Sequence, residues 1–384
     1  MTEKLYYIDS HLFEFDASVL SCNPDETAGG RYAVILDRTA FFPEGGGQLS
    51  DTGIIENARV SDVQEVAGEI IHYVSIPVPA GPVHCTLDSE QRCRRMQNHS
   101  GEHVVSGLVH NEYGFDNVGF HMGERFMTID FSGELSWDQL SEIERKANEA
   151  VRANIPIRTF FPEPSALSRI DYRSKLELTE NVRIVEIEGI DRCACCAPHV
   201  SRTGEIGIIK LLGCERHRGG VRVELVCGMD ALDDYRIRQQ SAAEISNMLS
   251  SKRDDISSAV EKVLNERDEL KYALAGMENE LVKAISASFP DTADGNITVF
   301  RDLSEPACRE LVNLLVPKCT GMAAVFFSGS DSGTLRYIIG SRNIDLRAKA
   351  KEINAAINGR GGGKPEMIMG SASADRSVIE NYFL

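Results

Sequence analysis

The chain has 384 residues, of which 42% are apolar and 26% are charged, and its formal net charge is −17. This length allows two or three domains with cores of their own. No run of 18 or more apolar residues indicates a membrane span, and the start lacks a signal-peptide pattern, so we expect a cytoplasmic protein that binds no membrane. The acidic charge excludes a broad basic face, so any RNA must be bound by local patches.

Residues 1–88 consist of short apolar runs separated by turn residues. The clearest runs lie at 32–36, 53–55 and 70–74, with Gly, Pro, Asn and Asp between them. This pattern is typical of strands. Its regular spacing predicts a small β-barrel domain over 1–88, with a sandwich as the alternative.

From residue 89 the apolar rhythm becomes helical. Met96, Val104 and Leu108 fit one helix over 89–111. A second helix is predicted to begin at Ser136, because Ser136 and Gln139 fit a capping box. Strand-like runs follow at 183–187, 206–212 and 221–226. Residues 89–231 are therefore expected to form an α+β domain.

Residues 232–288 are rich in charge, lack proline and contain almost no glycine. Five apolar residues recur there at intervals of seven: Leu249, Ile256, Val263, Leu270 and Met277. This spacing is typical of a coiled-coil seam, although Arg267 interrupts the companion positions. The segment is predicted to be a helical stalk. It either folds back as a hairpin or pairs with a second copy in a homodimer, and both readings stay open.

Residues 289–384 alternate between strand and helix patterns. Strand runs lie at 322–327 and 335–339, a helix is expected at 344–357, and a glycine-rich loop at 359–365. The alternation predicts a small α/β domain, which is a second possible site of dimerisation. The chain as a whole is thus expected to be an α+β multidomain protein.

Two histidines form a candidate metal-binding pair on the first predicted helix. His99 and His103 are four residues apart, about 40° around the helix axis, so they share one face. The loop at 193–199 offers cysteines and His199, and zinc binds such mixed sets. Cys195 precedes His199 by four residues, but Cys193 and Cys196 are also within reach. The spacing alone does not choose the thiolate.

His99-x-x-Glu102-His103 also matches the inverted zincin motif, in which the glutamate activates water for peptide hydrolysis. In that protease group the third ligand is a carboxylate, whereas a Cys and a His are available here. Glu102 points away from the face shared by the two histidines, so we expect it to be a solvated helix residue.

The string Leu36–Gly53, which contains the turn Gly45-Gly46-Gly47-Gln48, lies upstream of the histidines. Together with His99/His103 and Cys195/His199, it resembles the editing domain of alanyl-tRNA synthetase and the freestanding AlaX-type editing proteins. Segments 204–207 and 219–224 are similar to the same family. Residues 289–384 resemble the DHH-associated domain, so the resemblance covers nearly the whole chain and fits the long AlaX form.

Two departures from the family pattern concern the pocket lining. Ser100-Gly101-Glu102 stands between the histidines, where the family commonly has Thr residues. The loop reads Cys195-Cys196-Ala197-Pro198-His199 in place of Cys-Gly-Gly-Thr-His. The ligand frame is kept, but the preferred substrate and the role of Glu102 stay open.

The resemblance implies a trans-editing hydrolase that removes serine or glycine from mischarged tRNA for alanine. It assigns Zn²⁺ to four ligands: His99, His103, Cys195 and His199. It also implies that Gln48 hydrogen-bonds the aminoacyl group and that Thr39 belongs to the same pocket, while Glu102 is kept as a candidate catalytic residue. The alternative from a different class is a non-catalytic tRNA-binding module with structural zinc.

Seven basic residues are the candidate tRNA contacts: Arg92, Arg94, Arg95, Arg218, Arg222, Arg360 and Lys364. An acidic protein that holds tRNA is expected to gather its few cations near the site. The glycines around the last two would let backbone N–H groups approach phosphates.

Overall fold

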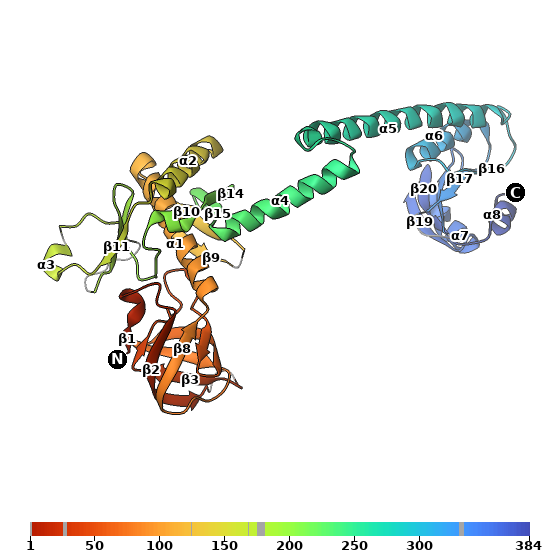
Figure 1. The fold of residues 1–384 in the computed structure, drawn as a ribbon. Helices are drawn as coiled ribbons and strands as arrows, with labels where there is room; N and C mark the ends of the chain where they lie inside the picture. Colours follow the sequence, from red (N-terminus) through yellow and green to blue (C-terminus); the bar gives the residue numbers. More distant parts are fainter. Residues whose placement is uncertain (1, 26–28, 124, 168, 175–180, 330–333) are drawn as a thin grey trace. The chain divides into compact units, whose positions relative to one another are not determined.

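The computed structural model describes residues 2–384 except 26–28, 124, 168, 175–180 and 330–333 (Figure 1). By its internal contacts the chain divides into two compact units, Met1–Ser241 and Ala242–Leu384. None of the described helices is long and apolar enough to cross a membrane.

Six strands of the first unit close into a barrel in the order β2-β3-β7-β6-β5-β8 (Figure 1). Alternate apolar side chains point inward, so Val34, Ile55 and Ile70 are fully buried in its core. The strand runs expected at 32–36, 53–55 and 70–74 are confirmed. The barrel strands are β2 (Glu14–Pro24), β3 (Tyr32–Leu36), β5 (Gly53–Ile55), β6 (Ala58–Val66), β7 (Glu69–Val74) and β8 (Gly81–Leu87). Before them in the chain, β1 (Glu3–Lys4) is followed by η1 (Leu5–Tyr7), and β1 pairs with β4 (Arg38–Thr39).

Helix α1 (Ser89–Tyr113) follows the barrel directly and confirms the helix expected from residue 89. The Asp88 carboxylate caps it by accepting a hydrogen bond from Gln91 N at 3.0 Å, and Gly114, with φ at 69°, ends it. The capping box expected at Ser136 is also present, at the start of α2 (Trp137–Ala153).

Two more sheets complete the first unit. A four-stranded sheet has the order β14-β15-β10-β9, and a three-stranded sheet has the order β11-β12-β13. The remaining bounds are β9 (Asn117–Met122), β10 (Met127–Phe131), β11 (Ile157–Phe160), α3 (Pro164–Leu167), β12 (Ile184–Ile187), β13 (Asp191–Ala194), η2 (Thr203–Ile206), β14 (Ile209–His217) and β15 (Gly220–Cys227).

Glycines allow both sheets to approach the middle of α1. A Cβ at Gly101 would lie 2.2 Å from Cys227 Sγ, and a Cβ at Gly107 would lie 2.4 Å from the Ile190 carbonyl oxygen. Larger residues at these positions would push the strands away. As a result, all ten residues from 98 to 107 are buried.

In the second unit a five-stranded sheet has the order β16-β17-β18-β20-β19. Alternate side chains of β17 enter two cores: Val325 packs with α5 and α6, while Phe326 packs with α7 and α8. The bounds are β16 (Ile297–Phe300), α6 (Glu305–Leu315), η4 (Val316–Lys318), β17 (Ala323–Ser328), β18 (Leu335–Gly340), α7 (Leu346–Ala356), β19 (Gly359–Lys364), β20 (Met367–Ala372) and α8 (Arg376–Phe383).

The segment 359–365, expected as a glycine-rich loop, contains strand β19, so that expectation is wrong. Its glycines permit close strand packing instead of a turn. A Cβ at Gly361 would lie 2.3 Å from the Met369 carbonyl oxygen and 2.4 Å from the Tyr337 hydroxyl. Glycine in a strand often marks such an approach of two backbones.

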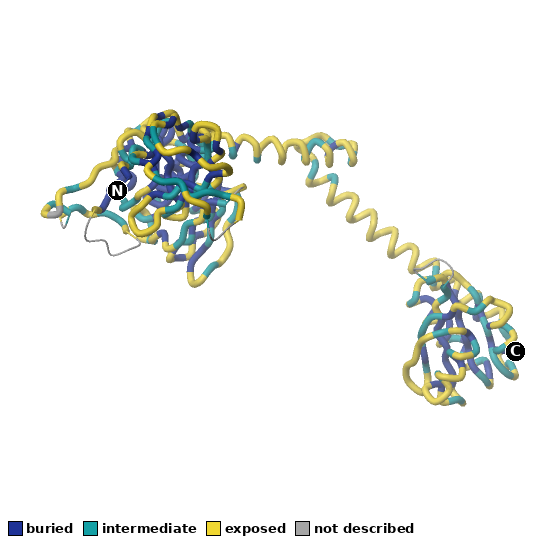
Figure 2. Tube along the Cα trace, turned by 90° about the horizontal axis from the view of Figure 1, so that it is seen from below, coloured by how far each residue is buried: buried dark blue, intermediate teal, exposed yellow. Residues whose placement is uncertain are grey.

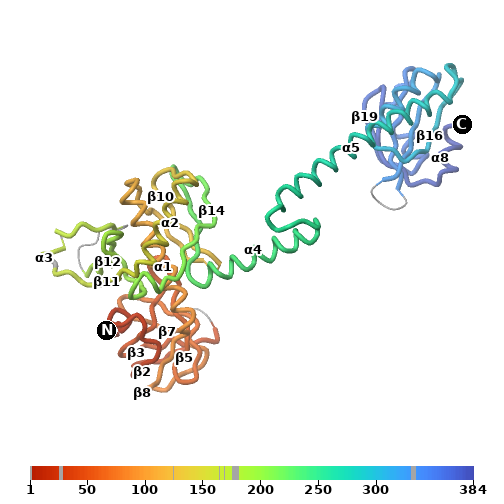
Figure 3. The backbone as a smooth tube through the Cα atoms, turned by 45° about the horizontal axis from the view of Figure 1, so that its top comes forward, coloured from red at the N-terminus to blue at the C-terminus, as the bar shows by residue number. Residues whose placement is uncertain are grey.

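The expected helical segment consists of α4 (Met229–Met248) and α5 (Ile256–Ala287), separated by a break that holds η3 (Arg253–Asp255). The seam residues Val263, Leu270 and Met277 of α5 are 48%, 70% and 72% exposed, and α5 is mostly yellow in Figure 2. Only its last turns, at Val282, join the apolar core of the second unit, whose sheet gathers at that end of α5 in Figure 3.

A buried ion pair ties α1 to the barrel. Arg92 is 0% exposed, and its Nε lies 3.1 and 3.0 Å from the two carboxylate oxygens of Asp51. Its remaining donors bind the carbonyl oxygens of Ser10, at 2.9 Å, and Ala40. Arg92 therefore fixes the direction in which α1 leaves the barrel.

The variant Asp51→Asn is expected to lower the free energy of unfolding by about 3–5 kcal/mol, because it leaves the Arg92 charge buried without a counter-charge. Denaturant unfolding measures this change. The matched control is Arg145→Ala, which removes exposed pairs on α2 and should leave the unfolding midpoint nearly unchanged. Equal midpoint shifts in the two variants would contradict the role of Arg92.

His72 on β7 is buried in the barrel. Its Nδ1 lies 3.1 Å from the Val34 carbonyl oxygen and its Nε2 lies 2.8 Å from Thr39 Oγ1. Burial lowers the pKa of His72 from 6.5 to about 4 because a charged imidazole is disfavoured inside the barrel. The folded protein therefore keeps His72 neutral at pH values where the unfolded chain protonates it.

Stability is expected to fall as the pH drops from about 6.5 to 4, since only the unfolded chain gains a proton on His72 in that window. The loss attributable to His72 is about 3 kcal/mol. The comparison of wild type with His72→Asn, by urea unfolding at several pH values, isolates this term. If the free energy of unfolding still rises more steeply with pH in the wild type than in His72→Asn above pH 7, His72 is not the cause.

Candidate functional site

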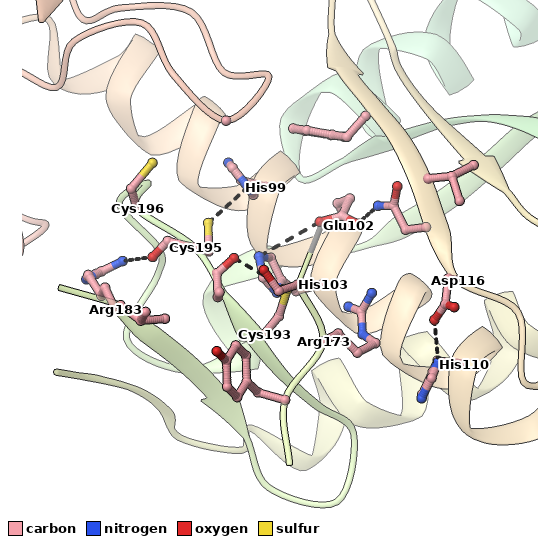
Figure 4. A pocket seen from close by; sticks show the side chains of 18 of the residues that line it. His99, Glu102, His103, His110, Asp116, Arg173, Arg183, Cys193, Cys195 and Cys196 are labelled. Atoms are coloured by element: carbon pink, nitrogen blue, oxygen red, sulfur yellow. Dashed lines mark hydrogen bonds and ion pairs between the residues drawn. The ribbon is translucent and has the colours of Figure 1, made fainter. Parts of the chain in front are cut away.

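Three histidines and one cysteine converge where α1 meets the loop that follows β13. His99 Nε2 lies 3.5 Å from Cys195 Sγ, and His199 Nε2 lies 3.4 Å from the same sulfur. Together with His103, their potential ligand atoms all lie within 4.8 Å of one another. Figure 4 shows His99 and His103 on the helix with Cys195 beside them. The structure thus brings together the four residues that the sequence analysis proposed as metal ligands.

The other ring nitrogen of each histidine has a partner of its own. His99 Nδ1 lies 2.9 Å from Gln48 Oε1, His103 Nδ1 lies 2.7 Å from Asp191 Oδ2, and His199 Nδ1 lies 3.1 Å from Ser100 Oγ. The amide and carboxylate oxygens can only accept, so they place the protons of His99 and His103 on Nδ1. This leaves the Nε2 lone pairs directed toward the cluster, as in zinc sites.

The electrostatics of the cluster favour a thiolate. Burial by itself raises the pKa of the Cys195 thiol, but His99 and His199 hold it well below its usual range. Burial lowers the pKa of His199 to about 3, so this imidazole is a neutral donor. Burial opposes the charged form of His103 as well, but the hydrogen bond with Asp191 raises its pKa well above 6.5.

The donor set fits zinc. Three imidazole nitrogens and one thiolate match a zinc ligand set, and partners on the outer nitrogens hold the rings in place. Cys193 groups with His103 and Asp191 instead, while Cys196 belongs to neither group. The geometry therefore favours Cys195 among the three cysteines of the loop.

A tight turn of the barrel positions Gln48 next to His99. Gly45 and Gln48 exchange backbone hydrogen bonds of 3.0 Å, and Gly46 and Gly47 have φ values of 61° and 83°. Positive φ at both central residues is what a type I′ turn requires. The Gln48 side chain is 1% exposed, its Oε1 supports the His99 ring, and its Nε2 has no partner among the described residues.

A cavity of about 820 Å³ opens beside the cluster. Its lining includes His99, Glu102, His103, Asn117, Arg173 and Cys195. Glu102 is 4% exposed, so the expectation that it is solvated is wrong. The helix has no solvent face at this point, since strands cover the side opposite the histidines.

Thr39 lies elsewhere. It is 0% exposed, its hydroxyl contacts His72, and it accepts a hydrogen bond from Phe41 N at 3.1 Å. This corrects the expectation that Thr39 belongs to the aminoacyl pocket, because its side chain faces the interior of the barrel.

Two of the seven proposed RNA contacts are inside the protein. Arg92 is held by Asp51, and Arg95, which is 7% exposed, donates to the Ser50 carbonyl oxygen. These two arginines stabilise the junction of barrel and helix, so the expectation that they contact RNA is corrected.

The other five basic residues reach the surface. Arg94 is paired with Asp230 and Arg222 with Asp130, each at 2.7 Å. The remaining three are exposed: Arg218 in the turn between β14 and β15, and Arg360 and Lys364 on β19 in the second unit.

Sequence reasoning missed Asp191, Asn117, Arg173 and Arg183. Asp191 stands two residues before Cys193, and a carboxylate so close to metal ligands was a usable signal. Arg183 donates to the carbonyl oxygens of Cys195 and Ala197 at 3.0 and 2.8 Å, which shapes the ligand loop. No local pattern marked Arg183, because it lies 12 and 14 residues before the two carbonyl groups that it binds.

Two family models match the first unit. Residues 10–90 match the model for class II (A) tRNA synthetases, and residues 182–224 match the second additional domain of threonyl and alanyl tRNA synthetases. These ranges include the barrel and the loop that carries Cys195 and His199.

Curated relatives match along the whole chain. The alanyl-tRNA editing protein AlaX-L of Pyrococcus horikoshii is 27% identical over 402 residues, which cover 99% of this chain and 96% of that protein. The alanine–tRNA ligase of Ignicoccus hospitalis is 30% identical over 394 residues, which cover 99% of this chain but 42% of the ligase. The chain thus spans less than half the length of that ligase.

Among solved structures, the C-Ala domain from Aquifex aeolicus alanyl-tRNA synthetase is similar over 25% of this chain and 91% of that chain, with 13% identity and a TM-score of 0.20. The relation to the editing protein spans both units, and the synthetase models cover the barrel and the ligand loop. The chain is therefore similar along its whole length to an AlaX-type alanyl-tRNA editing protein and to part of the alanine–tRNA ligases.

Proposed function

We propose that this protein hydrolyses, in trans, the ester that joins serine or glycine to tRNA for alanine. The observation that carries the proposal is the cluster of His99, His103, Cys195 and His199 at the edge of an 820 Å³ cavity. The names of the relatives, an alanyl-tRNA editing protein and alanine–tRNA ligases, point to the same substrate.

An aminoacyl ester is already activated toward hydrolysis. The site therefore mainly has to hold the ester carbonyl group and a water molecule in the positions needed for the water to attack. When bound to the four ligands, Zn²⁺ supplies a fixed positive charge that orients the aminoacyl group. Gln48 and Asp191 hold the rings of His99 and His103 and are positioning residues. That Gln48 also hydrogen-bonds the aminoacyl group, as the resemblance implies, stays a prediction. Four protein ligands fill a zinc tetrahedron, which favours this orienting role over a zinc-bound hydroxide.

The same filled tetrahedron favours one alternative, a tRNA-binding module in which zinc is purely structural. That module needs no cavity beside the metal. A metallopeptidase of the inverted zincin type is disfavoured, because its third zinc ligand is a carboxylate, whereas Cys195 and His199 lie beside the histidine pair here.

Wild-type protein is expected to deacylate Ser- or Gly-charged tRNA for alanine and to spare the Ala-charged form. His103→Ala and Cys195→Ala should lose bound zinc and deacylation together, by about 100-fold or more. Removing a residue that only supports a metal ligand already lowers metal affinity or activity about 10- to 100-fold, and removing the ligand itself should cost at least as much. Single-turnover deacylation and metal analysis measure the two losses.

The matched control is Cys196→Ala, an exposed neighbour in the same loop. It should retain zinc and activity. Deacylation that survives the loss of zinc would overturn the metal site, and the absence of deacylation with every charged tRNA would favour the binding module.

For tRNA contact we propose Arg218, Arg360 and Lys364, which are exposed, with Arg94 and Arg222 at the surface beside their acidic partners. Pairing of two copies through α5 or the second unit also stays a prediction. The exposed seam of Val263, Leu270 and Met277 supports it.

The double variant Arg360→Ala/Lys364→Ala is expected to weaken tRNA binding equally for charged and uncharged tRNA. Each lost phosphate contact should reduce the slope of log affinity against log salt by about 0.9. Binding titrations at several salt concentrations measure the slope. Lys349→Ala/Lys351→Ala on α7 is the matched control, since it removes the same charge from another exposed surface. An unchanged slope in the first variant would exclude β19 as a tRNA contact.

A further inference from the structure

Glu102 is a buried carboxylate with one oxygen held and the other turned to the cavity. Oε1 accepts hydrogen bonds from Ser106 Oγ, at 2.5 Å, and from Asn117 Nδ2. Within the described part of the chain Oε2 makes no hydrogen bond, and it lies 3.9 Å from His103 Nε2. Figure 4 shows Glu102 beside His103.

The two donors on Oε1 are themselves fixed. Asn117 Oδ1 accepts a hydrogen bond from Gly119 N at 3.1 Å, which turns the amide nitrogen of Asn117 toward Glu102. The same nitrogen lies 3.2 Å from Ser106 Oγ. The orientation of the carboxylate is therefore set before any ligand arrives.

The nearby basic side chains are engaged with a different carboxylate. Arg173 Nε donates to Asp191 at 2.8 Å, and His103 Nδ1 binds the other oxygen of Asp191. Glu102 has only neutral hydrogen-bond donors. A buried charge in such surroundings is unfavourable unless a charged partner completes it.

The other carboxylates that line the cavity differ from Glu102 in burial. Asp116 and Asp171 are exposed, and Asp116 lies 2.9 Å from His110. Among the described lining residues, Glu102 is thus the buried carboxylate whose second oxygen makes no hydrogen bond, and the His103 ring that lies 3.9 Å from it is already hydrogen-bonded to Asp191.

We infer that Glu102 Oε2 is a binding site for a primary ammonium group, and that its ligand is the α-ammonium of the aminoacyl ester. This inference rests on the proposed function. An α-amino group has an ordinary pKa of about 8, so it is cationic at neutral pH and can pair with the carboxylate. Glu102 then selects aminoacyl esters over acyl esters without an amine and places the carbonyl beside the histidine cluster.

The experiment compares two esters on tRNA for alanine: the seryl ester and the α-hydroxy ester made by deaminating it. Wild type is expected to hydrolyse the seryl ester about 10- to 100-fold faster, which is the contribution of a hydrogen-bonded charge. In Glu102→Gln the amide oxygen can still accept from Ser106 and Asn117. That variant should lose the preference by slowing the seryl ester alone, with its zinc content unchanged.

Asp116→Asn is the matched control, because it removes an exposed carboxylate from the same cavity, and it should keep the preference. Two results would overturn the inference. An equal loss on both esters in Glu102→Gln would make Glu102 a proton acceptor for water, and a loss of zinc in that variant would make it a metal-supporting residue.

A binding measurement on the unmodified protein does not depend on any variant. L-serinamide should bind more tightly than its neutral isostere 2,3-dihydroxypropanamide, by about 10-fold or more. Equal affinities would overturn the ammonium site. Preferential binding of serinamide by a protein that hydrolyses no charged tRNA would leave the ammonium site standing and reject the proposed function.

Discussion

The middle turns of α1 are almost fully buried, because the barrel junction and two sheets pack around residues 98–107 and leave open only the side that faces the cavity. A buried polar group without a partner costs about 1–3 kcal/mol, so the polar side chains on these turns need hydrogen-bond partners, and most of these come from other elements. Gln48 comes from a barrel turn, Asp191 from β13 and Asn117 from β9. The site is therefore assembled by the same contacts that pack the first unit.

The enclosure also orders the ligands without help from a metal. Oxygen acceptors on the outer nitrogens of His99 and His103 fix both the tautomer and the plane of each ring. Arg183 holds the carbonyl oxygens on either side of Cys196, which sets the loop that presents Cys195. Less conformational freedom is lost when a ligand binds to groups already in place, so a site of this kind gains affinity from its supporting shell.

Features encoded by local periodicity could be predicted from the sequence. The start of α1 after Asp88, the capping box at Ser136 and the strands at 32–36 and 53–55 follow from neighbouring residues. Burial could not be predicted in the same way. Arg92 and Glu102 look like solvated helix residues because the segments that cover them, around Asp51 and Asn117, are distant in sequence. The glycines of β19 indicated a loop because local composition does not show the close approach of β20 and of Tyr337 on β18 that these glycines permit.

Two carboxylates close to His103 have opposite electrostatic surroundings, and this contrast separates their roles. Burial by itself raises the pKa of Asp191, but hydrogen bonds from His103 and Arg173 hold it below its usual value. The negative charge of Asp191 is therefore balanced by partners within the protein. Glu102 is oriented by neutral donors and keeps one oxygen toward the cavity. A hydroxyl side chain in place of Glu102 would offer no such charge. The carboxylate at this position thus supplies the anionic contact that the inferred ammonium ligand needs.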